Sequence, residues 1–185
     1  MVESHFKPPE QLEDYEAHWG FVDWRGKRVL DLGADYGSTA YFFLQKGASR
    51  VVAVECDPGW YARLEKLAEV LPGITPVRRF VKTPDDLKEL FTGYDVDIAK
   101  IDCEGCEVTL LELGCEVIRR VEEYVIECHD GAYPALTVKH PYGMRELADK
   151  IEIKLRECGF ELLGRHPFNI VVHARRLDEE AADSY

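Results

Sequence analysis

Val29-Leu-Asp-Leu-Gly-Ala-Asp-Tyr-Gly-Ser-Thr-Ala40 decides the fold, because an apolar strand runs directly into two glycines and a helix begins at once. Glycine permits positive φ and lets a ligand approach the backbone closely. The first turn of the helix adds N–H groups without partners inside the helix. Gly33 and Gly37 are spaced as G-x-x-x-G, not as the G-x-G-x-x-G of dinucleotide-binding folds. The stretch therefore predicts a cofactor loop, but not one for NAD.

Acidic residues near the glycines indicate which cofactor fits. Asp31 and Asp35 would repel a pyrophosphate, whereas they would attract a cofactor that carries an ammonium and a sulfonium. Glu55 ends the next strand, where a carboxylate can accept hydrogen bonds from both ribose hydroxyls. The alternative is a purely structural turn, with Glu55 as a solvated strand end. We expect S-adenosylmethionine, bound by Asp31, Gly33, Ala34, Asp35, Tyr36, Gly37, Ser38, Glu55, Cys56 and Asp102.

Apolar strands alternate with amphipathic helices along the rest of the chain, which predicts a mostly parallel sheet covered on both faces. A hairpin after five β–α units is typical of the doubly wound, seven-stranded Rossmann-like sheet of class I methyltransferases, whose last strand is antiparallel. The expected domain covers residues 27–176, after a lead-in at 1–26 with a short helix at 9–19 and before an acidic tail at 177–185. The expected strands are 28–32, 50–55, 74–81, 96–101, 123–128, 160–164 and 169–174, and the helices are 38–46, 58–71, 83–91, 107–120 and 143–158.

Four motifs occur in order: Asp31-Leu-Gly-Ala-Asp-Tyr-Gly37, Val54-Glu-Cys-Asp-Pro58, Lys100-Ile-Asp-Cys-Glu-Gly-Cys-Glu107 and Ile126-Glu-Cys-His129. Together they resemble the motifs of the FkbM-type family of class I S-adenosylmethionine-dependent methyltransferases, over about residues 27–130. The resemblance implies methylation of hydroxyl oxygens on sugars or other small natural products. This chain departs from the family pattern at Asp35, where Asn is usual, and at Cys103 and Cys106, where aliphatic residues or Ala are usual.

Polar side chains follow the fourth and fifth expected strands. Asp102 and Glu104 come after one strand, while Glu127 and His129 end its neighbour. Ligands bind outside the carboxyl ends of such strands, so these groups could orient a hydroxyl and remove its proton. We assign catalysis to Asp102, Glu104 and His129, with His129 or Asp102 as the base and Glu127 or Glu104 holding the His129 tautomer. Structural roles and a divalent metal stay open as alternatives, and no metal ligand is assigned.

The residues after the fifth strand are either a lid over the acceptor or an ordered surface loop: Tyr133, Pro134, His140, Pro141 and Tyr142.

Six cysteines occur, at 56, 103, 106, 115, 128 and 158. We expect most of them to be buried thiols, with a disulfide left open. Cys103 and Cys106 form a C-x-x-C pair, but no second C-x-x-C or H-x-x-x-H follows that would complete a zinc site. The sequence therefore predicts no structural zinc.

Composition restricts the partners. The net charge of −12 over 185 residues disfavours nucleic acid, and the absence of a signal peptide or an apolar span predicts a cytoplasmic protein without membrane contact. A small-molecule acceptor fits best, and a homo-oligomer stays open. The alternatives are an RNA or protein methyltransferase that works with a partner, and a non-catalytic S-adenosylmethionine-binding domain.

Overall fold

The computed structural model describes residues 7–132, 134–166 and 170–177. The chain divides into two compact units, Met1–Arg79 and Phe80–Tyr185. Tyr133, Asn169 and the acidic tail from residue 178 onward lie outside the described residues. None of the described helices is both long and apolar enough to cross a membrane.

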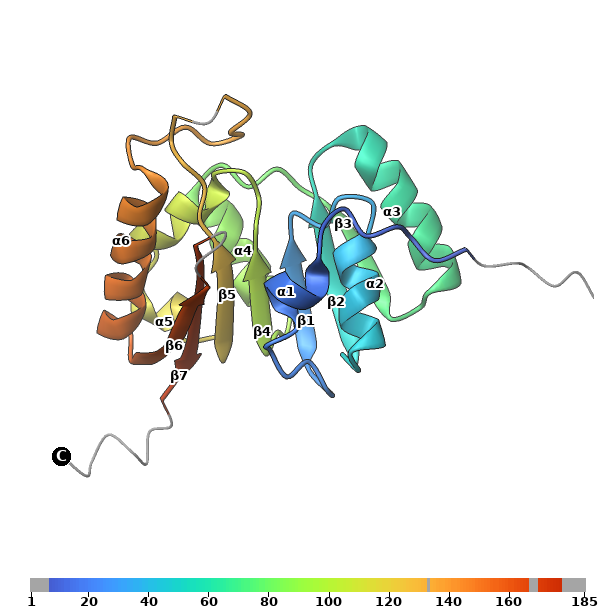
Figure 1. Ribbon diagram of the computed structural model, residues 1–185, viewed down its shortest axis with the longest axis horizontal. Helices are drawn as coiled ribbons and strands as arrows, with labels where there is room; N and C mark the ends of the chain where they lie inside the picture. The colour runs from blue at the N-terminus through green and yellow to red at the C-terminus, as the bar shows by residue number, and fades with distance from the viewer. Residues whose placement is uncertain (1–6, 133, 167–169, 178–185) are drawn as a thin grey trace, which may run out of the picture. The chain divides into compact units, whose positions relative to one another are not determined.

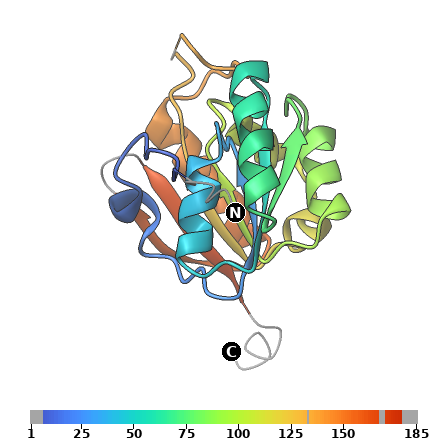
Figure 2. The ribbon, with the colours of Figure 1, turned by 90° about the vertical axis from the view of Figure 1, so that its right-hand side faces the viewer.

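The first unit is a three-stranded parallel sheet with helices packed against it. The strand order is β3-β2-β1, and α2 and α3 lie side by side on one face (Figures 1 and 2). Its elements are α1 (Tyr15–Trp19), β1 (Arg28–Leu32), α2 (Ser38–Gln45), β2 (Arg50–Glu55), α3 (Pro58–Val70) and β3 (Ile74–Arg78).

The strands and helices of this unit follow from local sequence. The β2 segment Val51–Val54 is uninterrupted apolar sequence and fully buried, as expected for a strand covered on both faces. Helix α3 begins where the side chain of Asp57 accepts hydrogen bonds from the amides of Gly59 and Trp60, with Pro58 at the first helical position.

The predicted lead-in proves to be part of the packed core of the first unit. Trp19 and Trp24 are almost completely buried, and the Trp24 ring stacks on Phe43 with ring centroids 4.1 Å apart. The hydroxyl of Tyr15 is hydrogen-bonded to Ser38 at 2.7 Å. Residues 15–24 therefore support α2 rather than merely preceding the domain.

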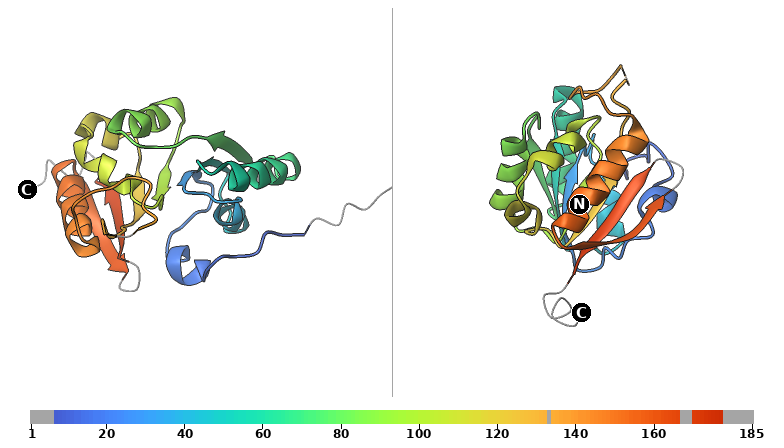
Figure 3. Two further views of the ribbon diagram at one scale, coloured as in Figure 1. Left: turned by 90° about the horizontal axis from the view of Figure 1, so that it is seen from above. Right: turned by 90° about the vertical axis from the view of Figure 1, so that its left-hand side faces the viewer.

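The second unit has four strands in the order β4-β5-β7-β6. Strands β4 and β5 are parallel, whereas β7 is antiparallel to both β5 and β6. Helix α6 lies across β6 and β7 (Figure 3). The elements are α4 (Pro84–Gly93), β4 (Ile98–Ile101), η1 (Cys106–Glu112), α5 (Cys115–Ile118), β5 (Glu123–Glu127), α6 (Met144–Glu157), β6 (Phe160–His166) and β7 (Val171–Arg176).

One predicted element is wrong. The continuous helix expected over 107–120 is a 3₁₀ helix, η1, followed by the short α5. Leu113 and Gly114 have extended ψ values of 146° and 151° and separate the two. Glycine is a poor helix former, and the hydrogen bond from the Thr109 hydroxyl to the Cys106 carbonyl, at 2.7 Å, competes with regular helix pairing.

The expectation that most cysteines are thiols is also wrong. Disulfides join Cys103 to Cys106 and Cys115 to Cys158, with Cα–Cα distances of 5.5 and 5.0 Å, while Cys56 and Cys128 are free thiols. These distances lie in the range that a disulfide spans. Residues 115 and 158 are 43 positions apart, so only the fold brings them together.

Candidate functional site

The glycine loop, residues 33–38, joins β1 to α2 in the first unit. Gly33, Asp35 and Gly37 have φ of +82°, +48° and +89°. The amides of Gly33 and Ala34 both donate to the carbonyl of Val54 at 3.0 Å, which fixes the loop to the end of β2. A Cβ on Gly37 would lie 2.6 Å from Leu67 and 2.9 Å from Leu64. Gly37 therefore meets two needs at once, positive φ and close packing on α3.

Glu55 links the glycine loop to the turn after β2. One carboxylate oxygen accepts a hydrogen bond from the amide of Asp35 at 2.9 Å, and the other accepts from Cys56 at 2.8 Å and Asp57 at 2.7 Å. Only 7% of the residue is exposed, so Glu55 is not a solvated strand end. A carboxylate offers about four acceptor positions, so capacity for a ligand hydroxyl remains.

Other predicted cofactor residues also have structural partners. Asp31 is fully buried and accepts a 2.5 Å hydrogen bond from Thr39 of α2. The Tyr36 hydroxyl donates to the carbonyl of Glu10, and its ring stacks on Trp60 with centroids 5.2 Å apart, while the guanidinium of Arg63 lies 4.0 Å from the Tyr36 centroid and 5.1 Å from that of Trp60. Burial raises the pKa of the Cys56 thiol, which therefore stays protonated at neutral pH. The cofactor assignments remain predictions, and these contacts show how their side chains are held.

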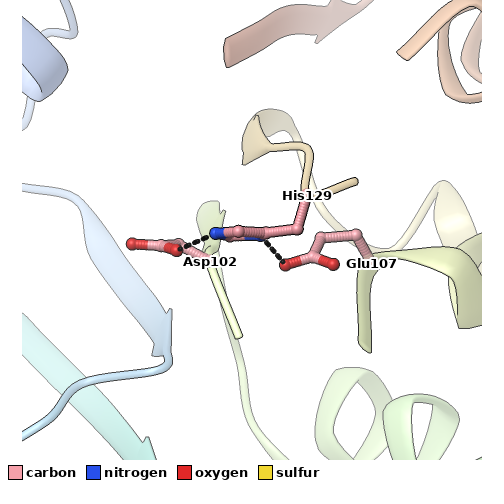
Figure 4. Close-up of side chains that lie close together, drawn as sticks. All are labelled: Asp102, Glu107 and His129. Carbon is pink, nitrogen blue, oxygen red and sulfur yellow. Dashed lines mark hydrogen bonds and ion pairs between the residues drawn. The ribbon is translucent and has the colours of Figure 1, made fainter. Parts of the chain in front are cut away.

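In the second unit, side chains from the ends of two adjacent strands meet in a charged cluster, which consists of Asp102, Glu104, Glu107 and His129. Strands β4 and β5 are parallel, so residues that follow them reach the same edge. Nε2 of His129 lies 3.6 Å from an oxygen of Asp102 and 3.6 Å from an oxygen of Glu104. Nδ1 lies 2.9 Å from Glu107 (Figure 4).

Glu107 is the member of the cluster that the sequence analysis missed. It is fully buried, and its Oε1 accepts hydrogen bonds from Nδ1 of His129 and, at 3.0 Å, from the Cys103 amide. Glu107, and not Glu127 or Glu104, therefore holds the His129 ring. Its place as the last acid of the motif 100–107 was the available signal.

The charges around His129 decide its protonation. Burial by itself lowers the pKa of the imidazole, but the hydrogen bond to Glu107 and the charges of Glu107, Asp102 and Glu104 outweigh it and raise the pKa to about 9. Burial also raises the pKa of Glu104. Lys100 is completely buried, with its ammonium 3.3 Å from the second oxygen of Asp102. Asp102 thus lies between two cationic groups.

A metal ion remains an alternative occupant of this cluster. Donor atoms of Asp102, Glu107 and His129 all lie within 4.8 Å of one another. The ring nitrogen Nδ1 already has a 2.9 Å hydrogen bond to Glu107. A metal ion bound through this ring would therefore use Nε2 or displace that hydrogen bond.

The segment after β5 packs on the turn that carries the cluster. The amide of Thr137 donates to the carbonyl of Glu104 at 2.8 Å, and its hydroxyl donates to the carbonyl of Cys103 at 3.0 Å. Gly105 has φ of +111°, and a Cβ there would lie 2.4 Å from the carbonyl oxygen of Val138. The segment is therefore ordered against residues 103–105, and its role as a lid stays a prediction.

The fold resembles that of solved methyltransferase structures. A proposed RNA methyltransferase from Pyrococcus horikoshii matches with a TM-score of 0.59 and 21% identity, covering 89% of this chain and 84% of that one. An S-adenosylmethionine-dependent methyltransferase from Mesorhizobium loti gives 0.56 and 16%, covering 86% and 98%. Aeropyrum pernix fibrillarin, solved with bound S-adenosyl-L-methionine, gives 0.54 and 17%, covering 81% and 66%. The predicted seven-stranded, mostly parallel fold with an antiparallel last strand is confirmed.

Sequence comparison adds the family. Residues 74–162 match the Methyltransferase FkbM domain, so the predicted FkbM-type resemblance is confirmed, and the chain is an S-adenosylmethionine-dependent methyltransferase. The predicted cofactor is the one used by this class. Relatives include Uncharacterized protein 65 of Sulfolobus islandicus filamentous virus, 28% identical over 126 residues, covering 67% of this chain and 73% of the relative. Uncharacterized protein 158B of Sulfolobus islandicus rod-shaped virus 1 is 29% identical over 123 residues, covering 63% and 70%.

Proposed function

We propose that the protein methylates a hydroxyl oxygen on a small acceptor, with His129 as the general base. The observation that carries the proposal is the arrangement of the imidazole, whose Nδ1 is bonded to buried Glu107 while Nε2 faces Asp102 and Glu104. A neutral hydroxyl is a poor nucleophile, so a positioned base is worth roughly 10²–10⁴-fold in rate. An unprotonated amine acceptor would not need one.

S-Adenosylmethionine supplies an electrophilic methyl group when it is bound. The residues that would hold it are the glycine loop and Glu55, whose carboxylate keeps acceptor capacity beyond its three backbone hydrogen bonds. Nε2 of neutral His129 would accept the proton of the acceptor hydroxyl. Asp102 and Glu104 then stabilise the imidazolium, because each has an oxygen 3.6 Å from Nε2.

The raised pKa of His129 has two consequences for this step. It makes the neutral imidazole a stronger base, which favours proton transfer. It also leaves only roughly 1% of the imidazole neutral at pH 7, two units below a pKa of about 9. Turnover is therefore expected to rise with pH and to level off above pH 9.

The test is methyl transfer from labelled S-adenosylmethionine to a panel of sugars, phenols and hydroxy acids, with a matching panel of amines. We expect methyl ethers by mass spectrometry, lost in His129→Ala. Methylation of amines alone, undiminished in that variant, would contradict the proposal. A protein that binds the cofactor but transfers no methyl group to either panel or to RNA would be a non-catalytic binding domain.

A second acceptor class is supported by a hollow in the first unit. Lys7, Arg63 and Lys66, with one acid, Glu10, line an open space of about 430 Å³ that Tyr36 of the glycine loop also borders. Such a basic surface suits a phosphate-bearing polymer despite the net charge of −12. Among structures of similar fold are a Methanococcus jannaschii fibrillarin described as a pre-rRNA processing protein and a fibrillarin/Nop5p complex. RNA binding that Arg63→Ala and Lys66→Ala abolish would favour this candidate.

A further inference from the structure

A disulfide lies inside the turn that carries the charged cluster. Cys103 and Cys106 are bonded to each other between Asp102 and Glu107. Cys103 is partly exposed, whereas only 1% of Cys106 is exposed. Cys103 is therefore the residue of the pair that is open to solvent, while Cys106 is shielded inside the fold. Accessibility of this kind separates exchangeable disulfides from inert ones.

The disulfide touches the carboxylate that orients His129. Sγ of Cys103 lies 3.6 Å from Oε1 of Glu107, the oxygen that also accepts hydrogen bonds from the Cys103 amide and from His129. In the disulfide this sulfur carries no proton, so it cannot donate to Glu107. After reduction, the same sulfur bears an S–H group within reach of the oxygen and competes with His129 for it.

The backbone of the turn depends on the same covalent link. Glu104 and Gly105, between the two cysteines, have φ of +57° and +111°. A non-glycine residue with positive φ is strained by about 1–3 kcal/mol and persists only where its surroundings impose it. The disulfide closes the backbone around Glu104, so breaking it removes the covalent restraint on this residue and leaves the hydrogen bonds from Thr137 to hold it near His129.

We propose that Cys103–Cys106 is a reversible thiol–disulfide exchange site that switches the charged cluster between an organised, oxidised state and a relaxed, reduced state with lower turnover. The co-reactant is a dithiol. Its thiolate attacks Sγ of Cys103, the S–S bond breaks, and Cys106 leaves as a thiolate that takes up a proton. The second thiol of the reductant then displaces Cys103, so that two electrons pass to the protein and the reductant becomes a disulfide.

The other cysteines leave this exchange undisturbed. Burial raises the pKa of Cys128 far above its usual value, and burial raises that of Cys56 as well, so both remain thiols and are poor nucleophiles. The second disulfide, Cys115–Cys158, joins the start of α5 to the end of α6 and supplies a matched control.

The inference rests on the proposed role of His129, so its test has two readouts. The full-length protein is equilibrated in dithiothreitol buffers of graded potential, and bond state is followed by alkylation and mass spectrometry. Turnover is measured together with the His129 titration by NMR of the ring. Reduction of Cys103–Cys106 is expected to lower turnover about tenfold or more. It is also expected to change the pKa of the His129 ring that the NMR titration measures. Asp102, Glu104, Glu107 and His140 are the titratable groups around that ring.

Two variants isolate the bond. Cys115→Ser/Cys158→Ser is expected to keep the response to dithiothreitol, and Cys103→Ser/Cys106→Ser is expected to lose it and to stay at the low turnover. The NMR readout works without an acceptor, so failure of the proposed methylation would not conceal the result. The proposal is overturned if reduction leaves both the His129 titration and turnover unchanged. It is equally overturned if the response survives in Cys103→Ser/Cys106→Ser, or if the bond resists dithiothreitol in the folded protein.

Discussion

The glycine loop and the charged cluster are built in opposite ways. The loop is set by the backbone: two amides donate to Val54, and the amides of Asp35, Cys56 and Asp57 donate to Glu55. The cluster is set by side chains, with His129 held between Glu107 on one nitrogen and Asp102 and Glu104 on the other. A loop fixed by backbone hydrogen bonds is suited to binding one constant cofactor, whereas a cluster of titratable side chains is suited to moving a proton.

The contrast predicts separate effects of mutation. Changes at the loop should alter cofactor affinity, and changes in the cluster should alter turnover. The comparison fails if a single substitution in either region changes both quantities equally.

The largest effect is expected in the cluster. His129→Ala removes the proposed base and should lower turnover by roughly 10²–10⁴-fold with S-adenosylmethionine affinity unchanged. Single-turnover kinetics and titration calorimetry on the same preparation measure the two quantities. Asp102→Asn is the companion variant, because Asp102 is the other candidate base. Near-normal rates in both variants would make the cluster structural.

A large loss of stability is expected when the second disulfide, Cys115–Cys158, is removed. Cys115→Ser/Cys158→Ser opens a loop of 43 residues, which on the chain-entropy estimate costs about 4 kcal/mol of unfolding free energy. Denaturant unfolding under non-reducing conditions measures it, with the Cys103→Ser/Cys106→Ser variant beside it. Because that short loop constrains the unfolded chain less, its loss should cost less. The reverse ranking would contradict this account of the two bonds.

A smaller loss of stability is expected at Gly105. Gly105→Ala imposes positive φ on alanine and places a Cβ 2.4 Å from the Val138 carbonyl, so we expect a destabilisation of at least about 2 kcal/mol. Gly93→Ala is the matched control in the same unit, because nothing lies within 4 Å of its added Cβ. Equal melting temperatures for the two variants would show that residues 137–138 do not pack firmly on the turn.

The pH dependence of turnover tests the role of Glu107 in setting the pKa of His129. Its carboxylate helps to raise the His129 pKa to about 9, so Glu107→Gln removes a negative charge and should lower that pKa toward the ordinary 6.5. Because the neutral imidazole is the active form, the acid limb of the turnover profile should move to lower pH by about 1–2 units. An unmoved limb would mean that another group is the base.

The two regions also differ in what the sequence reveals. Gly33, Gly37 and Glu55 lie in contiguous strand–turn–helix patterns whose geometry is local, so the loop and its link to β2 could be anticipated. The partner of His129 could not, because Glu107 reaches the ring only after the segment following β4 turns back as a 3₁₀ helix. Helical periodicity predicted a longer α-helix there. The Cys115–Cys158 pair was hidden for the same reason, since only tertiary packing brings the ends of α5 and α6 together.

The most direct test of the account is to compare Glu55→Ala with His129→Ala by titration calorimetry with S-adenosylmethionine and by methyl transfer at saturating cofactor. Glu55→Ala should weaken cofactor binding by about 1–3 kcal/mol, because charge-assisted hydrogen bonds to the ligand and to the glycine loop are lost, and should recover most of its turnover at saturation. His129→Ala should bind the cofactor normally and turn over slowly. Wild-type protein that binds NAD more tightly than S-adenosylmethionine, or a His129→Ala variant that loses cofactor affinity while Glu55→Ala keeps it, would contradict the account.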